Sequence, residues 1–401
     1  MPDRALLETT AGRVVATLVG LLVLGVVAGL ALLWPDGAAT PRPQGPGAGA
    51  IERAQVLSIA RGDCEHFAGP GCRVAELELR SGPERGRRTF LALPGDRFAP
   101  PIEAGDSIRV ARNTRGESGE QVPLGDASQY PVAFVDFERS SPLLILALAF
   151  VALVVVLGRW HGVRALVGLG LSLALVVEFL APAILENRPL VLTALVGALA
   201  VMVVTIVLSH GAGLKSMAAM LGTAGALLLT AVLAVIAVRG AAITGLSSEQ
   251  ATLLLAGVEG ELSLQGLVVA GMVIGALGVL DDVTVSQAST VLALRRANPA
   301  LGFRRLLGEA LVVGRDHLGA TVNTLVLAYA GAALPVLLIF NTEGTPFGDA
   351  VSREPVAEQI VAMLVGSIGL IAAVPLTTAI AALLASRLPA AAVPEHRGHA
   401  H

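Results

Sequence analysis

The sequence contains little charge. Asp, Glu, Lys and Arg make up 15% of its 401 residues, and the formal net charge at pH 7 is -3. A net charge of this size gives no support to a polyanionic partner, so we expect no binding to nucleic acid. Hydrophobic residues make up 54% of the chain, and its mean hydropathy is +0.74. Apolar runs of about 20 residues recur, which indicates a helical polytopic membrane protein whose main partner is the lipid bilayer.

Motifs of several enzyme classes are also absent. No apolar run contains the His-Glu-x-x-His pattern of zinc proteases, and the chain has neither a Gly-x-x-x-x-Gly-Lys-Ser/Thr phosphate loop nor a Gly-x-Ser-x-Gly nucleophile elbow. These absences disfavour an ATP-driven pump and a serine hydrolase. We therefore expect no enzymatic activity and no organic cofactor, and we leave a bound metal unassigned.

Cysteine is limited to two residues, Cys64 and Cys72. On the outer side of a membrane, where thiols oxidise, they could close a disulfide loop. The alternative is two free thiols, because sequence spacing does not give the Cα–Cα distance that a disulfide needs. We favour the disulfide.

Changes in composition divide the chain into segments. The first, residues 1–34, ends in the apolar run Val14–Trp34, which stops without an Ala-x-Ala cleavage site. We therefore expect an uncleaved membrane anchor after a short cytoplasmic N-terminus. The remaining segments are a Pro/Gly linker at 35–50, a β domain at 51–138, a seven-helix membrane domain at 139–386 and a cytoplasmic tail at 387–401.

The segment 51–138 carries short strand-like runs separated by turn residues such as Pro94-Gly95-Asp96. The runs are Ala54–Ile59, Arg73–Leu79, Arg88–Leu93, Ser107–Ala111 and Pro131–Phe137. Five short strands in one small segment predict an antiparallel barrel, and an OB-like barrel is the best candidate.

Including the anchor, we expect eight membrane spans. The seven that follow the β domain lie at about 142–158, 165–186, 190–208, 216–238, 266–293, 318–340 and 359–385. With a cytoplasmic N-terminus, the short outer loops hold only Arg188, Arg239 and Arg353. The inner segments then hold Arg4, Arg13, Arg159, Arg164, Lys215, Arg295, Arg296, Arg304, Arg305, Arg315, Arg387 and Arg397. This bias predicts cytoplasmic termini and an extracytoplasmic β domain.

Two adjacent carboxylates, Asp281 and Asp282, lie inside a run that is apolar enough to cross a bilayer. An ionisable side chain near the centre of a membrane helix costs roughly 2.5 to 3.5 kcal/mol, so such residues usually face a bundle interior or a watery cavity. A helix broken near Gly278 could coordinate a cation there, or the carboxylates could relay protons. The structural alternative is that both aspartates pair with arginines or backbone groups and hold the bundle together.

A helical wheel separates the two aspartates. One face carries three candidate helix-packing glycines and one aspartate: Gly271, Gly275, Gly278 and Asp282. Small residues on a face let another helix approach closely. Asp281 lies on a neighbouring polar strip with Thr284 and Gln287, which should point inward because lipid would leave it unsatisfied. If only one aspartate is functional, we choose Asp281 and give Asp282 a structural role.

Further polar residues begin the next span. Asp316 and His317 lie at its entrance and Asn323 lies deeper. Because this span should run antiparallel to the one before it, Asp316 or Asn323 is expected to meet the polar strip. His317 could carry protons or act as a ligand, although we favour an interfacial hydrogen-bonding residue. The predicted ion or substrate pathway comprises Asp281, Asp282, Thr284, Gln287, Asp316, His317 and Asn323.

Several longer motifs occur in a fixed order. They are Phe134-Val-Asp-Phe-Glu-Arg139, Gly158-Arg-Trp-His-Gly162, Gly245-Leu-Ser-Ser248, Gly275-Ala-Leu-Gly-Val-Leu-Asp-Asp-Val-Thr-Val-Ser-Gln287, Gly314-Arg-Asp-His-Leu-Gly319 and Thr321-Val-Asn-Thr324. From about residue 50 to 385 the chain resembles the YibE/F family of bacterial multi-pass membrane proteins. The resemblance implies this architecture and a bacterial plasma membrane, and it implies no activity because the family is known mainly as uncharacterised proteins.

Three functions fit these features. A transporter or permease with a pathway past Asp281 and Asp282 is our first hypothesis, with its substrate, direction and coupling ion unassigned. The second is a non-catalytic envelope assembly factor or sensor that acts through the β domain. A membrane-embedded aspartyl peptidase is disfavoured, because adjacent residues point about 100° apart on a helix, so Asp316 would have to supply the second carboxylate. A homo-oligomer and an envelope partner both stay open.

Overall fold

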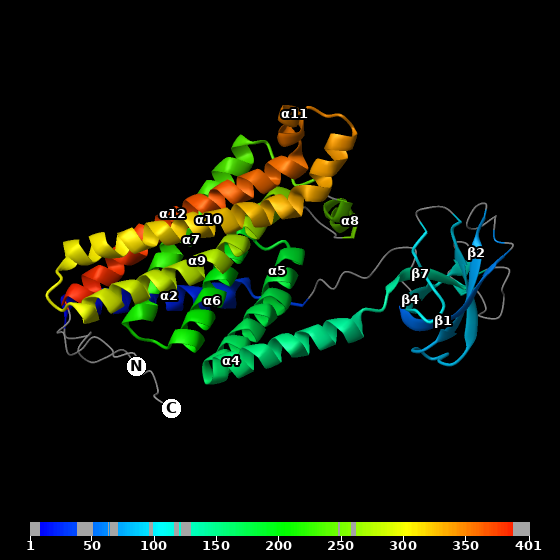
Figure 1. Ribbon diagram of the computed structural model, residues 1–401, viewed down its shortest axis with the longest axis horizontal. Coiled ribbons are helices and arrows are strands. Elements are labelled where there is room, and N and C mark those ends of the chain that lie inside the picture. Colours follow the sequence, from blue (N-terminus) through cyan, green and yellow to red (C-terminus); the bar gives the residue numbers. More distant parts are fainter. Residues whose placement is uncertain are drawn as a thin grey trace. The chain divides into compact units, whose positions relative to one another are not determined.

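The computed structural model describes residues 9–37, 51–62, 64, 71–95, 99–115, 120–121, 130–247, 249–257 and 262–387 (Figure 1). Its contacts divide the chain into two compact units. One comprises Met1–Thr40 and Val154–His401 and is called the helical unit here; the other comprises Pro41–Leu153 and is called the β unit.

The β unit contains one curled sheet of five strands. They are β1 (Glu52–Arg61), β2 (Arg73–Leu79), β3 (Arg88–Leu93), β4 (Ser107–Arg112) and β7 (Val132–Phe137), and a separate short pair is β5 (Thr114–Arg115) with β6 (Glu120–Gln121). The order is β3-β2-β1-β4-β7, all neighbours are antiparallel, and β3 also contacts β7. The five strands expected from the sequence are confirmed, each within two residues of its expected ends.

Buried and less buried side chains alternate along the strands of this sheet. In β2 the side chains of Ala75, Leu77 and Leu79 are buried, while the residues between them are only half-buried. Val56 of β1 and Ile108 of β4 join the same apolar core. Residues at every second position of a strand share one face, so the sheet buries one row from each strand.

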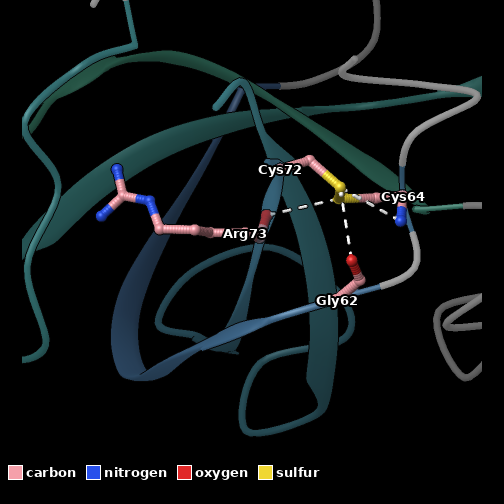
Figure 2. The surroundings of a disulfide bond; sticks show 4 residues. All are labelled: Gly62, Cys64, Cys72 and Arg73. Atoms are coloured by element: carbon pink, nitrogen blue, oxygen red, sulfur yellow. Dashed lines mark hydrogen bonds between the residues drawn. A yellow bond between two sulfur atoms is a disulfide. The ribbon is translucent and has the colours of Figure 1, made fainter. Parts of the chain in front are cut away.

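Cys64 and Cys72 form a disulfide at one end of the β unit (Figure 2). Their Cα atoms are 5.9 Å apart, and both side chains are buried beside Tyr130. The Cys64 N–H also points at the Cys72 Sγ at 3.1 Å. The crosslink ties the segment after β1 to the start of β2, so those two antiparallel strands are joined by covalent and hydrogen bonds.

Glu138 joins the end of β7 to β4 and to the start of α4 (Ser140–Leu175). Its carboxylate accepts hydrogen bonds from the Ser140 N–H at 3.0 Å, from the Ser140 hydroxyl, and from Arg109 Nε at 2.9 Å. These bonds from Ser140 and then Arg109 lower the pKa of Glu138 to about 2. The charged carboxylate therefore satisfies one of the free N–H groups at the start of α4.

The lowered pKa of Glu138 predicts a stability that depends on acid pH. Because the folded pKa lies below the ordinary value of 4.5, the contribution is present above that value and is lost as pH falls through about 2. Between pH 5 and pH 2, the thermal unfolding midpoint of the wild type should fall more than that of Glu138→Gln. Glu103→Gln, at an exposed acid of the same unit, is the control. Parallel pH profiles for all three proteins would contradict this role.

The helical unit contains long apolar helices. They are α2 (Thr10–Leu33), the continuation of α4 through η2 (Val176–Leu180) and α5 (Ala181–Leu185), α6 (Leu190–His210), α7 (Leu214–Gly240), α9 (Leu264–Ala297), α10 (Phe303–Thr342) and α12 (Glu354–Arg387), with short helices α8 (Glu249–Gly257) and α11 (Phe347–Ser352). Within the described ranges, seven helices are long and apolar enough to cross a membrane, Ser140–Leu185 being treated as one. The expected long apolar helices are thus confirmed.

Two of the spans expected from the sequence, 142–158 and 165–186, fall within that one stretch. Its backbone leaves the helical region at Arg159, where φ is 48° and ψ is -133°. Arg159 therefore divides α4 into a first and a second arm. Gly162 lies against the carbonyl of Val154, since a Cβ added at Gly162 would lie 2.3 Å from that oxygen. The helix is therefore interrupted within the Gly158–Gly162 motif.

Substitution at this bend should weaken the fold. Gly162→Ala places a methyl group where the Val154 carbonyl oxygen lies, and overpacking of this kind typically costs about 1 to 3 kcal/mol. Gly158→Ala is the matched control, because no described atom outside its local chain lies within 4 Å of an added Cβ. Thermal unfolding in detergent should show a lower midpoint for Gly162→Ala alone. Equal midpoints for the two variants would contradict the close approach.

The centre of the helical unit is the packing of α7, α9 and α12. Glycines let α7 and α12 approach each other closely. A Cβ added at Gly222 of α7 would lie 1.9 Å from the Thr377 hydroxyl oxygen, and one at Gly369 of α12 would lie 2.1 Å from that of Thr230. Helices α2, α6 and α10 pack around this centre.

Candidate functional site

Asp281 lies near the middle of α9, on the side that faces α6. Its Oδ2 accepts a hydrogen bond of 3.0 Å from the hydroxyl of Thr205 on α6. Its Oδ1 is buried and accepts no hydrogen bond from any described residue. An unpaired carboxylate oxygen in an apolar bundle is costly, which makes it a candidate position for a proton or a cation.

Asp281 and Thr205 line a cavity of about 340 Å³ between the second arm of α4, η2, α6 and α9. The rest of its wall is mainly apolar: Ala165, Leu169, Ser172, Leu173, Leu175, Val176, Leu180, Gly197, Ala198, Val201, Ile274, Leu277 and Gly278. The hydroxyl of Ser172 already donates to the Gly168 carbonyl oxygen. Asp281 is the one ionisable group among these described lining residues, so it determines the charge of the cavity.

A single π-helical turn shapes one wall of this cavity. The Ala181 N–H donates to the Val176 carbonyl, the i→i+5 bond that defines the turn. Pro182 follows directly and has no N–H to donate to Glu178, which would be its partner in an α-helix. The turn leaves Val176 and Leu180 at the cavity, while Phe179 is fully buried with its ring 5.6 Å from that of Trp34, the residue that follows α2. Such turns often occur at functional sites.

The other two residues of the predicted polar strip meet different helices. Thr284 is buried and shares a hydrogen bond of 2.7 Å with Thr223 of α7. Gln287 is buried and donates from Nε2 to the Ala310 carbonyl of α10 at 2.7 Å. Steps of three residues turn a helix by about 300°, so the strip rotates around α9 as it descends. The structure therefore places Asp281 at a cavity and its two neighbours in packed contacts.

The glycine face of α9 is exposed along with Asp282. No described atom outside its local chain lies within 4 Å of a Cβ added at Gly271 or Gly278, and at Gly275 the nearest is the Tyr329 hydroxyl oxygen at 3.4 Å. Gly278 lines the cavity of Asp281, and Gly271 lines a second cavity. In the described part of the chain these glycines leave space beside α9, and a packing role for this face stays a prediction.

The predicted residues on α10 are not brought to Asp281. The side chains of Asp316, His317 and Asn323 are exposed, and Gln287 meets the α10 backbone at Ala310 instead. Among the described residues there is no group of three or more His, Cys, Asp or Glu side chains placed to hold a metal ion. The pathway roles of the three α10 residues stay predictions.

Sequence reasoning missed Thr205, the hydrogen-bond partner of Asp281. The available signal was a hydroxyl residue within the apolar run of α6. Because threonine can return its hydroxyl to its own helix, such a residue is not specific by itself, and Thr205 also lies within bonding distance of the Val201 and Met202 carbonyls. Only the packing of α6 against α9 shows that Thr205 reaches Asp281.

The apolar helices, the central helix packing and an aspartate within the bundle define a multi-pass integral membrane protein. A family model described as YibE/F-like protein matches residues 146–387, which is more than half of the chain. The chain therefore belongs to the YibE/F-like family, as its motifs indicated. Neither the curated proteins nor the solved structures compared with it include a match.

The Thr223–Thr284 pair should contribute to stability. Thr223→Val and Thr284→Val each remove one hydroxyl of this buried pair, and the Thr284 hydroxyl can still donate to the Asp281 carbonyl oxygen at 3.1 Å. Measured couplings of this kind inside membrane proteins average about 0.6 kcal/mol and reach about 1.7 kcal/mol. A double-mutant cycle on unfolding in detergent should give a coupling in this range. Thr324→Val, at an exposed threonine of α10, serves as the control, and strictly additive effects of the paired variants would contradict the contact.

Proposed function

We propose that this protein is a transporter or permease whose pathway passes Asp281. The observation that carries the proposal is Asp281 itself, which lines a 340 Å³ cavity between apolar helices and has a buried Oδ1 without a partner among the described residues. A purely structural aspartate would be expected to have both oxygens bonded, since each buried polar atom without a partner reduces stability. Here one oxygen is held by Thr205 and the other is free to exchange a partner.

The charge of the cavity restricts what Asp281 can bind. No basic residue occurs among the described lining residues, so nothing there neutralises an ionised Asp281. A proton or a cation would do so, and an anion would be repelled. Thr205 holds the carboxylate through Oδ2, and Oδ1 has no partner among the described residues. We therefore propose proton or cation passage, either alone or coupled to a substrate that fits the apolar wall.

We propose the same orientation that the basic residues predict. Both termini lie in the cytoplasm of a bacterium, the helices cross its plasma membrane, and the β unit lies outside. The Cys64–Cys72 disulfide supports this placement, because disulfides persist in oxidising compartments. For the β unit we propose an OB-like barrel, supported by the strand order β3-β2-β1-β4-β7 and by the contact that brings β3 to β7.

Ion flux in liposomes tests the role of Asp281. Purified protein should carry protons, sodium or potassium ions down an imposed gradient, read with an internal dye for each ion. Asp281→Asn should abolish this flux, because the amide cannot be charged. Thr205→Val removes a hydrogen bond to the ionised carboxylate, which is worth about 1.5 to 3 kcal/mol. Because the charged, ion-free Asp281 is then less stable, its affinity for a proton should rise roughly tenfold to a hundredfold.

Asp282→Asn is the matched control. Asp282 follows Asp281 in the sequence, but its side chain is exposed and does not line the cavity. It should retain most of the flux. Equal flux in the wild type and in a folded Asp281→Asn variant would contradict the proposed pathway. Loss of cellular function on deletion of residues 51–138, with normal flux in liposomes and normal function of Asp281→Asn, would instead favour an envelope assembly factor or sensor that acts through the β unit.

A further inference from the structure

A second cavity, of about 360 Å³, is lined by residues of α8, α9, α10, α12 and the described part of the loop that follows α7. Its residues differ from those of the Asp281 cavity, so the two are separate sites. Gly245 and Ser247, two residues of the Gly245-Leu-Ser-Ser248 motif, line this cavity, and the proposed transport pathway gives them no role.

One side of this cavity is polar. Glu358 of α12 supplies a carboxylate, and its Oε2 accepts a hydrogen bond of 2.7 Å from the Ser247 hydroxyl. Gln250, Gln359 and the phenol of Tyr329 also line it. No lysine, arginine or histidine occurs among the described lining residues, and Glu358 is their one acid. The site therefore has a single negative charge surrounded by neutral hydrogen-bonding groups.

Glu354 holds the polar side in place. It lies one helical turn before Glu358, and its Oε1 accepts hydrogen bonds from the N–H groups of Thr244 at 2.8 Å and Gly245 at 2.6 Å. Gly245 has a φ of +82°, and a Cβ there would lie 2.7 Å from the Cβ of Leu264 on α9. The loop is thus fixed against both α12 and α9, which positions Ser247 on Glu358 before any ligand binds.

Much of the remaining lining is apolar. Leu254 of α8 and Leu267, Val268 and Met272 of α9 contribute to it. Gly271 lies between them on α9 and leaves open space where a larger side chain would project. A ligand that fits both sides has a charged group at one end and an apolar group at the other.

We propose that this cavity binds a small organic cation, a molecule with an ammonium group and a short apolar tail. The ammonium donates to Glu358, and the neutral polar groups of Gln250, Gln359 and Tyr329 line the same cavity. The tail packs against the α8 and α9 side chains. An anion has no basic partner here, and a divalent metal, which takes six or more oxygen ligands as calcium does, finds a single carboxylate in a space much larger than one ion.

Calorimetry on the full chain in detergent tests this site. The probe is n-hexylammonium chloride, compared with 1-hexanol and sodium hexanoate, which have the same tail and a neutral or negative end. Hexylammonium should bind saturably to the wild type, and hexanoate should not. Glu358→Gln should weaken this binding roughly tenfold or more, because a hydrogen bond to a charged group is lost. Glu343→Gln, at an exposed acid outside the cavity, should bind as the wild type does.

A steric variant makes the test independent of the carboxylate. Gly271→Leu fills the cavity without replacing any polar residue and should block binding, whereas Gly278→Leu fills the Asp281 cavity and should leave hexylammonium binding unchanged. Gel filtration and thermal unfolding check that each variant is folded. Undiminished binding in folded Gly271→Leu or Glu358→Gln, or equal affinity for 1-hexanol, would overturn the proposal. The transport proposal is tested separately, by the ion flux of Gly278→Leu and Asp281→Asn. If it failed, the flux of these variants would be unchanged, and hexylammonium binding would still depend on Glu358 and Gly271.

Discussion

The close approach of α7 to α12 is the interaction on which the rest of the helical unit depends. Lipid is as apolar as leucine, so membrane helices gain little by hiding apolar side chains from it and associate through tight packing. Gly222 and Gly369 supply that packing, because each faces a threonine of the other helix at a distance that no side chain would permit. Helix α9 lies against both and completes the central group.

The two cavities follow from where this packing ends. Where α9 packs against α7 and α10, its polar residues Thr284 and Gln287 have partners. Elsewhere on α9, Gly271 and Gly278 have no close neighbour among the described residues, and the spaces beside them stay open. Glycine therefore has two opposite uses in this protein. Between α7 and α12 it lets the helices approach closely, and at these two positions of α9 it leaves space for something to bind.

Local features of the fold could be predicted from the sequence. The strands of the β unit follow from alternation and turn residues, and the apolar helices follow from composition, because both signals lie within a few residues of the element they specify. The bend at Arg159 also falls in a loop expected between two spans. A helical wheel correctly separated Asp281 from Asp282, since that angle is a property of the helix alone.

The surroundings of the site could not be predicted in the same way. Thr205 lies 76 residues before Asp281, and which helix faces a given side of α9 depends on the packing of the whole bundle. For the same reason the wheel showed that Gly271, Gly275 and Gly278 share a face, but not that this face is open. Asp316 and Asn323 were expected to approach the strip because their span follows in sequence, yet the neighbour that covers a residue is decided by rotation about each helix axis.

The π-helical turn has a consequence for how the chain can vary. One added residue in a helix rotates the residues after it by about 100°. The π-helical turn therefore helps to decide in which direction the side chains of Phe179 and Leu180 project. The number of residues between Arg159 and Pro182 therefore matters for the cavity wall as well as their identity. A deletion there that preserved every apolar side chain would still move Phe179 away from Trp34 and change which residues form the cavity wall.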